Sequence, residues 1–387
     1  MSKKIPKNVW ILGVVSFFND IASEMIYPIV PIFLTSVLYV PVSIIGLIEG
    51  FAEATASIMK FISGYFSDKI QKRKPFVVLG YGLGSISKLL IGLAYSWPFV
   101  LFARFIDRLG KGVRTSARDS LLLQNATPQN KGYIFGFHRT FDSLGAVLGP
   151  LLALILLYSF KENIRSVFFI AFIPSAIGVL LLILFVREKK KEEDEKFKFS
   201  FKWKNLNPKY KFFLIVSLIF ALGNSSDAFL ILRAQNLGLT TILVTLTYVL
   251  YNLSQTIFST PAGSLADKIG ARKVFAIGLL VFAAVYFGFG IIKSPVFIWA
   301  LFPIYGIYIA FTDGISKAYI SEFVTEKESG TYFGLYQMGT AICAFFASFV
   351  GGLIWSQFNP SATFYYGSIM AVLAFLILSY GKLIKKI

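Results

Sequence analysis

Long apolar runs separated by short polar connections dominate this chain. Runs of about 18 or more apolar residues can cross roughly 30 Å of hydrocarbon as helices. They are too continuous for the alternating strands of a membrane barrel. The pattern therefore predicts an all-α polytopic membrane protein with twelve transmembrane helices. These helices are expected at 8–38, 42–67, 75–95, 98–122, 132–157, 164–186, 210–234, 240–266, 273–292, 295–323, 329–356 and 360–382.

Composition points the same way. Hydrophobic residues make up 56% of the chain, the mean hydropathy is +0.69 and charged residues make up 15%, whereas a soluble domain usually carries about 25% charged residues. The first run is too long for a secretory signal, so we expect it to remain uncleaved. The one cysteine, Cys343, excludes an internal disulfide.

The net charge of +18 is distributed by connection. Connections after the first, third and eleventh runs carry no Lys or Arg, whereas basic residues gather at both ends of the chain and after the second and eighth runs. This is the positive-inside pattern. It predicts a multi-pass protein of the cell (plasma or inner) membrane with both termini cytoplasmic. The charge thus orients the protein, and we expect no nucleic-acid partner.

Two segments are repeated in the two halves of the chain. GYFSDKIQKRK at 64–74 returns as GSLADKIGARK at 263–273, and KGYIFGFHRTF from Lys131 is similar to SGTYFGLYQMG from Ser329. Repeats of this kind are typical of transporters built from two bundles. The predicted domains are a six-helix bundle at 1–186, a charged cytoplasmic linker at 187–211 and a pseudo-symmetric six-helix bundle at 212–387.

With these repeats, the chain resembles the major facilitator superfamily over nearly its whole length. The paired loops resemble the family's G-x-L-A-D-R-x-G-R-K motif, although Gln71 and Ala271 depart from it. RFIDRLGKG, from Arg104, resembles R-x-x-Q-G-x-G, with Asp107 and Arg108 as departures. The fifth run resembles the family's antiporter motif without its last Gly. The antiporter-type residues are Gly136, Gly145, Gly149 and Pro150.

The paired loops are predicted to form a cytoplasmic gate. A Gly permits close helix packing, an Asp can accept bonds from helix N-terminal amides, and a basic residue can reach a neighbouring helix. Asp119 is the expected partner of the basic residues in the first loop. Plain loop solubility is the alternative interpretation. The gate residues are Gly64, Asp68, Lys72, Arg73, Asp119, Gly263, Asp267 and Arg272.

The fourth run carries seven ionisable residues at steps of three and four, within an arc of roughly 140° on a helix. One charge facing lipid costs about 2.5–3.5 kcal/mol. We therefore expect this stripe to face the bundle interior or an aqueous path, with Phe102 and its apolar neighbours on the other side. The stripe consists of Arg104, Asp107, Arg108, Lys111, Arg114, Arg118 and Asp119.

Polar residues in other runs complete the candidate site. Asp20 and Glu24 are the first candidates for proton coupling, followed by the pair His138 and Asp142. Mutual pairing of packing ions is the alternative interpretation. The proton-coupling candidates are Asp20, Glu24, Glu49, Glu53, His138 and Asp142. The solute candidates are Asn19, Asp20, Glu24, Arg104, Asp107, Arg108, Lys111, Asn224, Asp227, Tyr251 and Asn252.

We interpret the chain as a secondary transporter that works by alternating access. Proton-coupled export of a small organic solute is favoured, with the solute anionic or amphipathic. Import by symport and a transporter-like sensor without flux remain as alternatives. A membrane enzyme is disfavoured because one His and one Cys offer no reactive constellation. The expected partners are a small-molecule substrate, protons and the bilayer. We expect a monomer without cofactor or metal.

Overall fold

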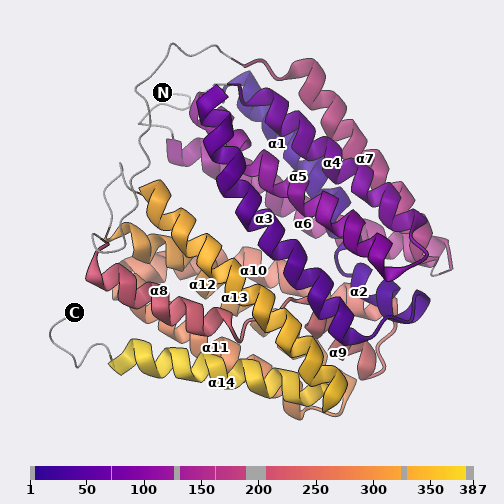
Figure 1. Cartoon of the computed structure of the whole chain (residues 1–387), viewed down its shortest axis with the longest axis vertical. Helices are drawn as coiled ribbons and strands as arrows, with labels where there is room; N and C mark the ends of the chain where they lie inside the picture. Colours follow the sequence, from indigo (N-terminus) through magenta and orange to yellow (C-terminus); the bar gives the residue numbers. More distant parts are fainter. Residues whose placement is uncertain are drawn as a thin grey trace. The chain divides into compact units, whose positions relative to one another are not determined.

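The computed structural model describes residues 5–70, 72–125, 131–161, 163–188, 206–323 and 329–380, and all regular elements in those residues are helical (Figure 1). In chain order they are α1 (Lys7–Ile26), α2 (Val30–Ile32), the π-helical η1 (Phe33–Val37), α3 (Val42–Ile70), α4 (Lys74–Leu93), α5 (Trp97–Leu123), α6 (Lys131–Ser159), α7 (Ile164–Phe185), α8 (Pro208–Ala221), α9 (Ala228–Asn236), α10 (Thr241–Ile269), α11 (Ala271–Ile291), the 3₁₀ turn η3 (Pro295–Phe297), α12 (Ile298–Ser321), α13 (Ser329–Gln357) and α14 (Pro360–Tyr380).

The prediction of an all-α membrane protein is confirmed. Within the described residues, ten helical segments are long and apolar enough to cross a membrane. The other two predicted spans are helical but fail that test for physical reasons. Helix α5 carries the ionisable stripe, and the seventh span is divided into α8 and α9, each too short to cross alone.

Two spans are broken in ways that the hydropathy pattern did not reveal. The first span turns at residues 27–29, where Pro28 removes a backbone donor, and it continues through α2 and η1. The seventh span opens between Ala221 and Ala228. That opening places six residues, 222–227, outside regular helix between α8 and α9. Residues 189–205 of the predicted linker lie outside the described residues.

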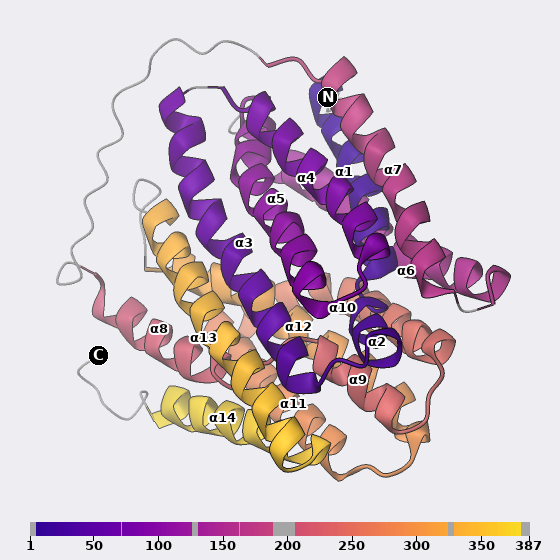
Figure 2. The ribbon, with the colours of Figure 1, turned by 45° about the vertical axis from the view of Figure 1, so that its right-hand side comes forward.

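Residue contacts divide the chain into two compact units. The first contains residues 1–39 and 55–196, and the second contains 40–54 and 197–387. Helix α3 contributes to both. Its first half packs on α13 within the second unit, where a Cβ on Gly50 would lie 2.9 Å from the Phe345 carbonyl oxygen. The two helices lie side by side in Figures 1 and 2.

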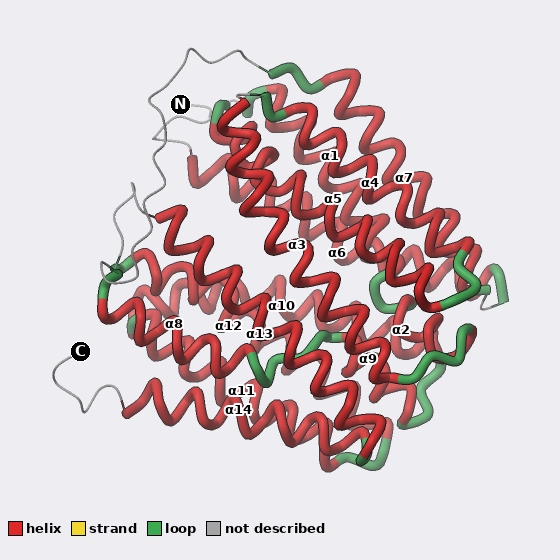
Figure 3. The backbone as a smooth tube through the Cα atoms, in the orientation of Figure 1, coloured by secondary structure: helices red, strands yellow, loops and turns green. Residues whose placement is uncertain are grey.

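Short connections join neighbouring helices, as the tube in Figure 3 shows. The connection between α10 and α11 is a single residue, Gly270, with φ of 92°. Only glycine adopts that conformation without strain. Gly270 is the second glycine of GSLADKIGARK, after the gate residue Gly263, and the turn itself accounts for its presence there.

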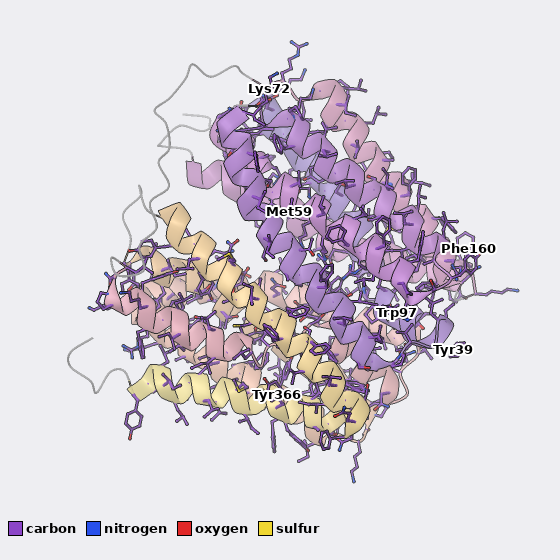
Figure 4. The ribbon with its side chains drawn as sticks, in the orientation of Figure 1. Tyr39, Met59, Lys72, Trp97, Phe160 and Tyr366 are labelled. Atoms are coloured by element: carbon purple, nitrogen blue, oxygen red, sulfur yellow. The ribbon has the colours of Figure 1, made fainter. Side chains whose placement is uncertain are left out.

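The two ends of the first unit differ in chemistry. The exposed aromatic residues Tyr39, Trp97 and Phe160 gather at one end, and Lys72 projects from the other (Figure 4). Aromatic residues are enriched where a membrane protein meets the membrane–water interface, and lysines in cytoplasmic loops. Along the helices of the first unit, aromatic residues therefore lie at one end and a lysine at the other, as is expected of transmembrane helices.

Candidate functional site

The charged stripe of α5 is turned largely inward. Arg104, Arg108 and Arg114 are 2%, 5% and 7% exposed, whereas Phe102 on the other side is 52% exposed. Lys111 is exposed. A helix that buries its arginines and exposes a phenylalanine is inverted relative to a soluble helix, and this is the orientation that a hydrocarbon surrounding favours.

Helix α4 approaches α5 closely because both carry glycine at the crossing. A Cβ on Gly80 would lie 2.6 Å from the Gly110 carbonyl oxygen, and a Cβ on Gly110 would lie 2.5 Å from that of Gly80. Small residues allow such backbone approach between membrane helices. The crossing also places the Arg114 guanidinium 4.4 Å from the Tyr81 ring centroid, a cation–π distance.

Asp107 is the acidic centre of this crossing. Its Oδ1 lies 3.8 Å from Lys88 Nζ and accepts a 3.1 Å hydrogen bond from Ser87, and its Oδ2 lies 4.0 Å from Arg108 Nε. Lys88 is 1% exposed and also donates to the Gly84 carbonyl at 2.8 Å. Our sequence analysis passed over Lys88. A lysine inside an apolar run could have indicated this site, because burying a charged side chain in a membrane costs free energy.

A second network joins α1, α4, α5 and α6. Ser16 donates a 2.6 Å hydrogen bond to Asp142 Oδ1 and accepts one of 3.2 Å from Arg118 and one of 3.4 Å from Tyr81. His138 Nδ1 lies 3.5 Å from Asp142 Oδ2. The structure therefore brings the predicted pair together, and Ser16 links it to the α5 stripe.

His138 retains an unused atom in this network. The side chain is 3% exposed, and among the described residues its Nε2 is buried without a hydrogen-bond partner. A buried ring nitrogen that lacks a partner is a position where a proton or a polar ligand atom can be accommodated.

The predicted coupling residues on α1 face the glycines of α6. A Cβ on Gly145 would lie 2.8 Å from Asp20 Cβ, and a Cβ on Gly149 would lie 2.9 Å from Glu24 Cβ. The two helices thus touch along the turn that carries both acids. Pro150 is buried inside α6, and the side-chain position of Gly136 lies outside the described residues.

Asn19 occupies a different position from its neighbour Asp20. It is 1% exposed, its Oδ1 accepts a 2.8 Å bond from Ser175, and its Nδ2 donates to the Val15 carbonyl at 3.0 Å. Ser175 lies 2.6 Å from the Ser85 hydroxyl. This buried chain ties α1 to α7 and α4, so the visible role of Asn19 is to hold helices together.

The two remaining acidic candidates of the first half belong to the second unit. Glu49 and Glu53 lie on the part of α3 that belongs to the second unit, and Glu49 is 2% exposed. Both make interactions within the protein.

The gate motif is partly visible. Lys72 is exposed, and the backbone amides of Arg73 and Lys74 at the start of α4 donate 2.5 and 3.0 Å bonds to Glu188. Asp119 lies 3.1 Å from Arg118 on its own helix. Its predicted pairing with the basic residues of the loop stays a prediction, and so do the roles of Gly64 and Asp68, whose surroundings lie outside the described residues.

In the second copy of the motif, the basic residue donates a hydrogen bond to a backbone carbonyl near the C-terminus of α14. The Arg272 guanidinium donates to the Leu378 carbonyl and lies 6.0 Å from the Phe212 ring centroid. Asp267 is exposed. No neighbour would lie within 4 Å of a Cβ on Gly263 among the described residues.

The second unit holds its polar candidates around the break in the seventh span. Asp227 accepts hydrogen bonds from Tyr305 at 2.7 Å and from Tyr251 at 3.2 Å, and Asn224 donates to the Tyr308 hydroxyl at 3.1 Å. Our sequence analysis missed Tyr305 and Tyr308. Because aromatic residues make up 17% of the chain, a single tyrosine does not stand out in the sequence.

Comparisons with known proteins agree with this architecture. The model of the Major Facilitator Superfamily matches residues 12–233 and 212–384. An uncharacterized MFS-type transporter of Methanocaldococcus jannaschii is 39% identical over 386 residues, which is 98% of this chain and 96% of that protein. The chain belongs to the major facilitator superfamily.

Solved structures show the same major facilitator fold. The nucleoside transporter NupG, at 14% identity, covers 96% of this chain and 99% of its own with a TM-score of 0.80. A peptide transporter POT in complex with sulfate, at 13% identity, covers 97% and 94% with a TM-score of 0.82. The chain is thus a membrane transporter of the major facilitator type, whose members carry small molecules across the membrane.

Proposed function

We propose that this transporter is a proton-coupled antiporter that exports a small organic solute, anionic or amphipathic. It works as a monomer in the plasma or inner membrane with both termini in the cytoplasm. The bundle at 1–186 rocks against the bundle at 212–387, and the charged linker at 187–211 connects them. Flux is driven by protons that bind and leave acidic side chains of the first bundle.

The observation that carries this proposal is the contact between α1 and α6. Gly145 and Gly149 bring the backbone of α6 against the turn that holds Asp20 and Glu24. A proton taken up there changes the charge at the tightest part of a helix contact. Proton binding and helix packing are then linked, and such differential binding is what shifts a conformational equilibrium.

The preference for an anionic solute rests on α5. Arg104, Arg108 and Arg114 are buried on the stripe, and the acidic centre of the α4–α5 crossing is Asp107. Basic side chains in a partly hydrated path attract carboxylate or phosphate groups. An amphipathic solute would use the aromatic residues of the chain instead.

The direction of proton movement tests the proposal. A solute is first found by screening metabolites and drugs for those that raise the melting temperature of the purified protein. Liposomes containing the protein and an internal pH dye then receive this solute from outside, with the membrane potential clamped. Antiport raises the internal pH, because protons leave as solute enters. Symport lowers the internal pH, and an unchanged pH would show that protons are not coupled.

Variants connect the result to α1. Asp20→Asn combined with Glu24→Gln should abolish the pH change, because neither side chain can then carry the proton. Asp313→Asn is the matched control. Asp313 is exposed and pairs with Lys317 at 3.4 Å on α12, in the other unit. A double variant that still moves protons with solute would remove Asp20 and Glu24 from the mechanism.

A further inference from the structure

A carboxylate and a group of tyrosines meet at the break between α8 and α9. Asp227 stands at the N-cap position of α9, yet its side chain makes no capping bond to that helix. The carboxylate is turned to the hydroxyls of Tyr251 on α10 and Tyr305 on α12, at 3.2 and 2.7 Å. Three separated segments of the second unit therefore converge on one acidic group.

The rings around the carboxylate form a continuous aromatic surface. The Tyr251 centroid lies 5.3 Å from that of Tyr248 and 5.4 Å from that of Tyr305, and Tyr305 lies 5.1 Å from Tyr308. The face of an aromatic ring carries negative potential and attracts cations, most strongly when they are desolvated. The hydroxyls of Tyr251 and Tyr305 donate their protons to Asp227, so each hydroxyl oxygen keeps lone pairs for a ligand.

The partial exposure of the carboxylate distinguishes this arrangement from a packed core. Tyr251 and Tyr305 are 7% and 2% exposed, whereas Asp227 is partly exposed. The carboxylate is thus the part of the cluster that a solute can reach, and the buried rings surround it. A negatively charged group beside aromatic rings is chemically complementary to a positively charged nitrogen.

Helix α10 carries a further buried polar side chain, Asn252. Asn252 follows Tyr251 on α10, and it lies one turn after Tyr248. It is 8% exposed, and among the described residues its Nδ2 is buried without a hydrogen-bond partner. A buried donor of this kind carries a desolvation cost that an acceptor oxygen on a ligand would offset.

We propose that Asp227, Tyr251 and Tyr305 bind an ammonium group of the transported solute. The solute class is therefore an amphipathic organic amine or quaternary ammonium compound, including zwitterions, so the inference selects the amphipathic solute of the proposed function and not a purely anionic one. This inference rests on the proposed transport function and names the chemistry of its solute.

Binding to purified full-length protein tests it, with cations matched to neutral isosteres. Methylammonium, choline and tyramine are each titrated beside a neutral partner of the same shape, such as 3,3-dimethylbutan-1-ol for choline. At least one cation should bind tenfold or more tightly than its partner. Equal binding of every pair, or no binding of any cation, would overturn the inference.

Variants locate the site. Asp227→Asn should weaken binding of the preferred cation at least tenfold and leave the neutral partner unchanged, and the exposed control Asp313→Asn should change neither more than twofold. Tyr251→Phe keeps the ring and should stay within threefold of wild type. Tyr251→Leu removes the ring and should lose about five- to tenfold.

If Asp227→Asn does not fold, the two Tyr251 variants still test the inference. Both remove the same hydroxyl, so a difference between them reports the ring alone. Equal affinity for the cation in Tyr251→Phe and Tyr251→Leu would contradict the inference. Proton flux in liposomes is scored separately. Flux of an anionic solute without cation binding overturns only the ammonium site. Cation binding that persists without any flux overturns the transport proposal and leaves the site standing.

Discussion

Gly145 of α6 lies so close to Asp20 of α1 that a Cβ added to the glycine would meet the Asp20 Cβ at 2.8 Å and the Phe17 carbonyl oxygen at 2.9 Å. The first distance is to an atom next to the backbone and the second is to the backbone itself. Neither can move without displacing α1. The contact therefore fixes the spacing of two helices at the acid that we propose to take up protons.

Enlarging these glycines should separate α1 from α6. Gly145→Ala and Gly149→Ala should each lower the free energy of unfolding by about 1–3 kcal/mol, the usual cost of overpacking. Melting temperatures in detergent measure the change, and proton-coupled flux should fall with it. Gly82→Ala on α4 is the control, since among the described residues nothing from another part of the chain lies within 4 Å of a Cβ there. That control should be neutral or slightly stabilising.

An unchanged melting temperature in both Gly145→Ala and Gly149→Ala would show that α1 and α6 are less tightly joined than the structure indicates. The antiporter-type motif would then have no steric role at this contact.

Removing one charge of the Lys88–Asp107 pair should lower the free energy of unfolding more than replacing both charged residues by apolar ones. Lys88→Met leaves the Asp107 carboxylate without its ammonium neighbour at 3.8 Å and should lower the free energy of unfolding by about 3–5 kcal/mol. Lys88→Met combined with Asp107→Leu removes both charges and should recover most of that loss. Melting temperatures of Lys88→Met, Asp107→Leu and the double variant give the interaction energy between the two residues. Additive losses would mean that the two residues do not interact.

The hydroxyl of Ser16 should matter more than its size suggests. Ser16→Ala removes a donor to Asp142 and an acceptor for Arg118, at 2.6 and 3.2 Å. Because hydrogen bonds to charged groups are worth about 1.5–3 kcal/mol, the variant should be destabilised by that order. Ser96→Ala is the matched control. Ser96 is exposed before α5 and makes no side-chain capping bond, so its loss should stay within about 0.5 kcal/mol.

Ser16→Ala should also alter the pH dependence of flux, because it removes the link between the α5 stripe and the His138–Asp142 pair. A variant with wild-type stability and an unchanged pH profile would exclude this network from both folding and coupling.

The helices could be predicted from the sequence because a span must be long and apolar throughout. Even α5 could be found, since its charges recur at helical steps and Arg104 and Arg108 are indeed buried. The break that places Asp227 could not, because five polar and small residues inside an apolar run do not alter its overall hydropathy. Contacts such as Tyr305 with Asp227 depend on the rotation of each helix, which hydropathy does not report.

Arg233 on α9 shows why a polar residue in a span need not contact the solute. Its guanidinium donates to the carbonyls of Phe289 and Ile292 at the end of α11, at 3.1 and 2.9 Å, and to the Asn236 side chain at 2.9 Å. It also reaches the Ser361 hydroxyl at 3.3 Å, at the start of α14. A buried cation at a helix C-terminus is favoured by the helix dipole and by the carbonyls that the helix leaves unpaired.

Replacing this arginine should therefore affect folding and leave solute selection intact. Arg233→Lys keeps the charge, but a single ammonium cannot span the two carbonyls, the amide and the hydroxyl. Each bond lost should cost about 1.5–3 kcal/mol, so a marked fall in melting temperature is expected. Ser361→Ala removes only the longest of these bonds and should cost about 1.5 kcal/mol, the low end of that range. If Arg233→Lys instead retained wild-type stability and changed the affinity for the solute, Arg233 would belong to the binding site, and the end of α11 would be held by other groups.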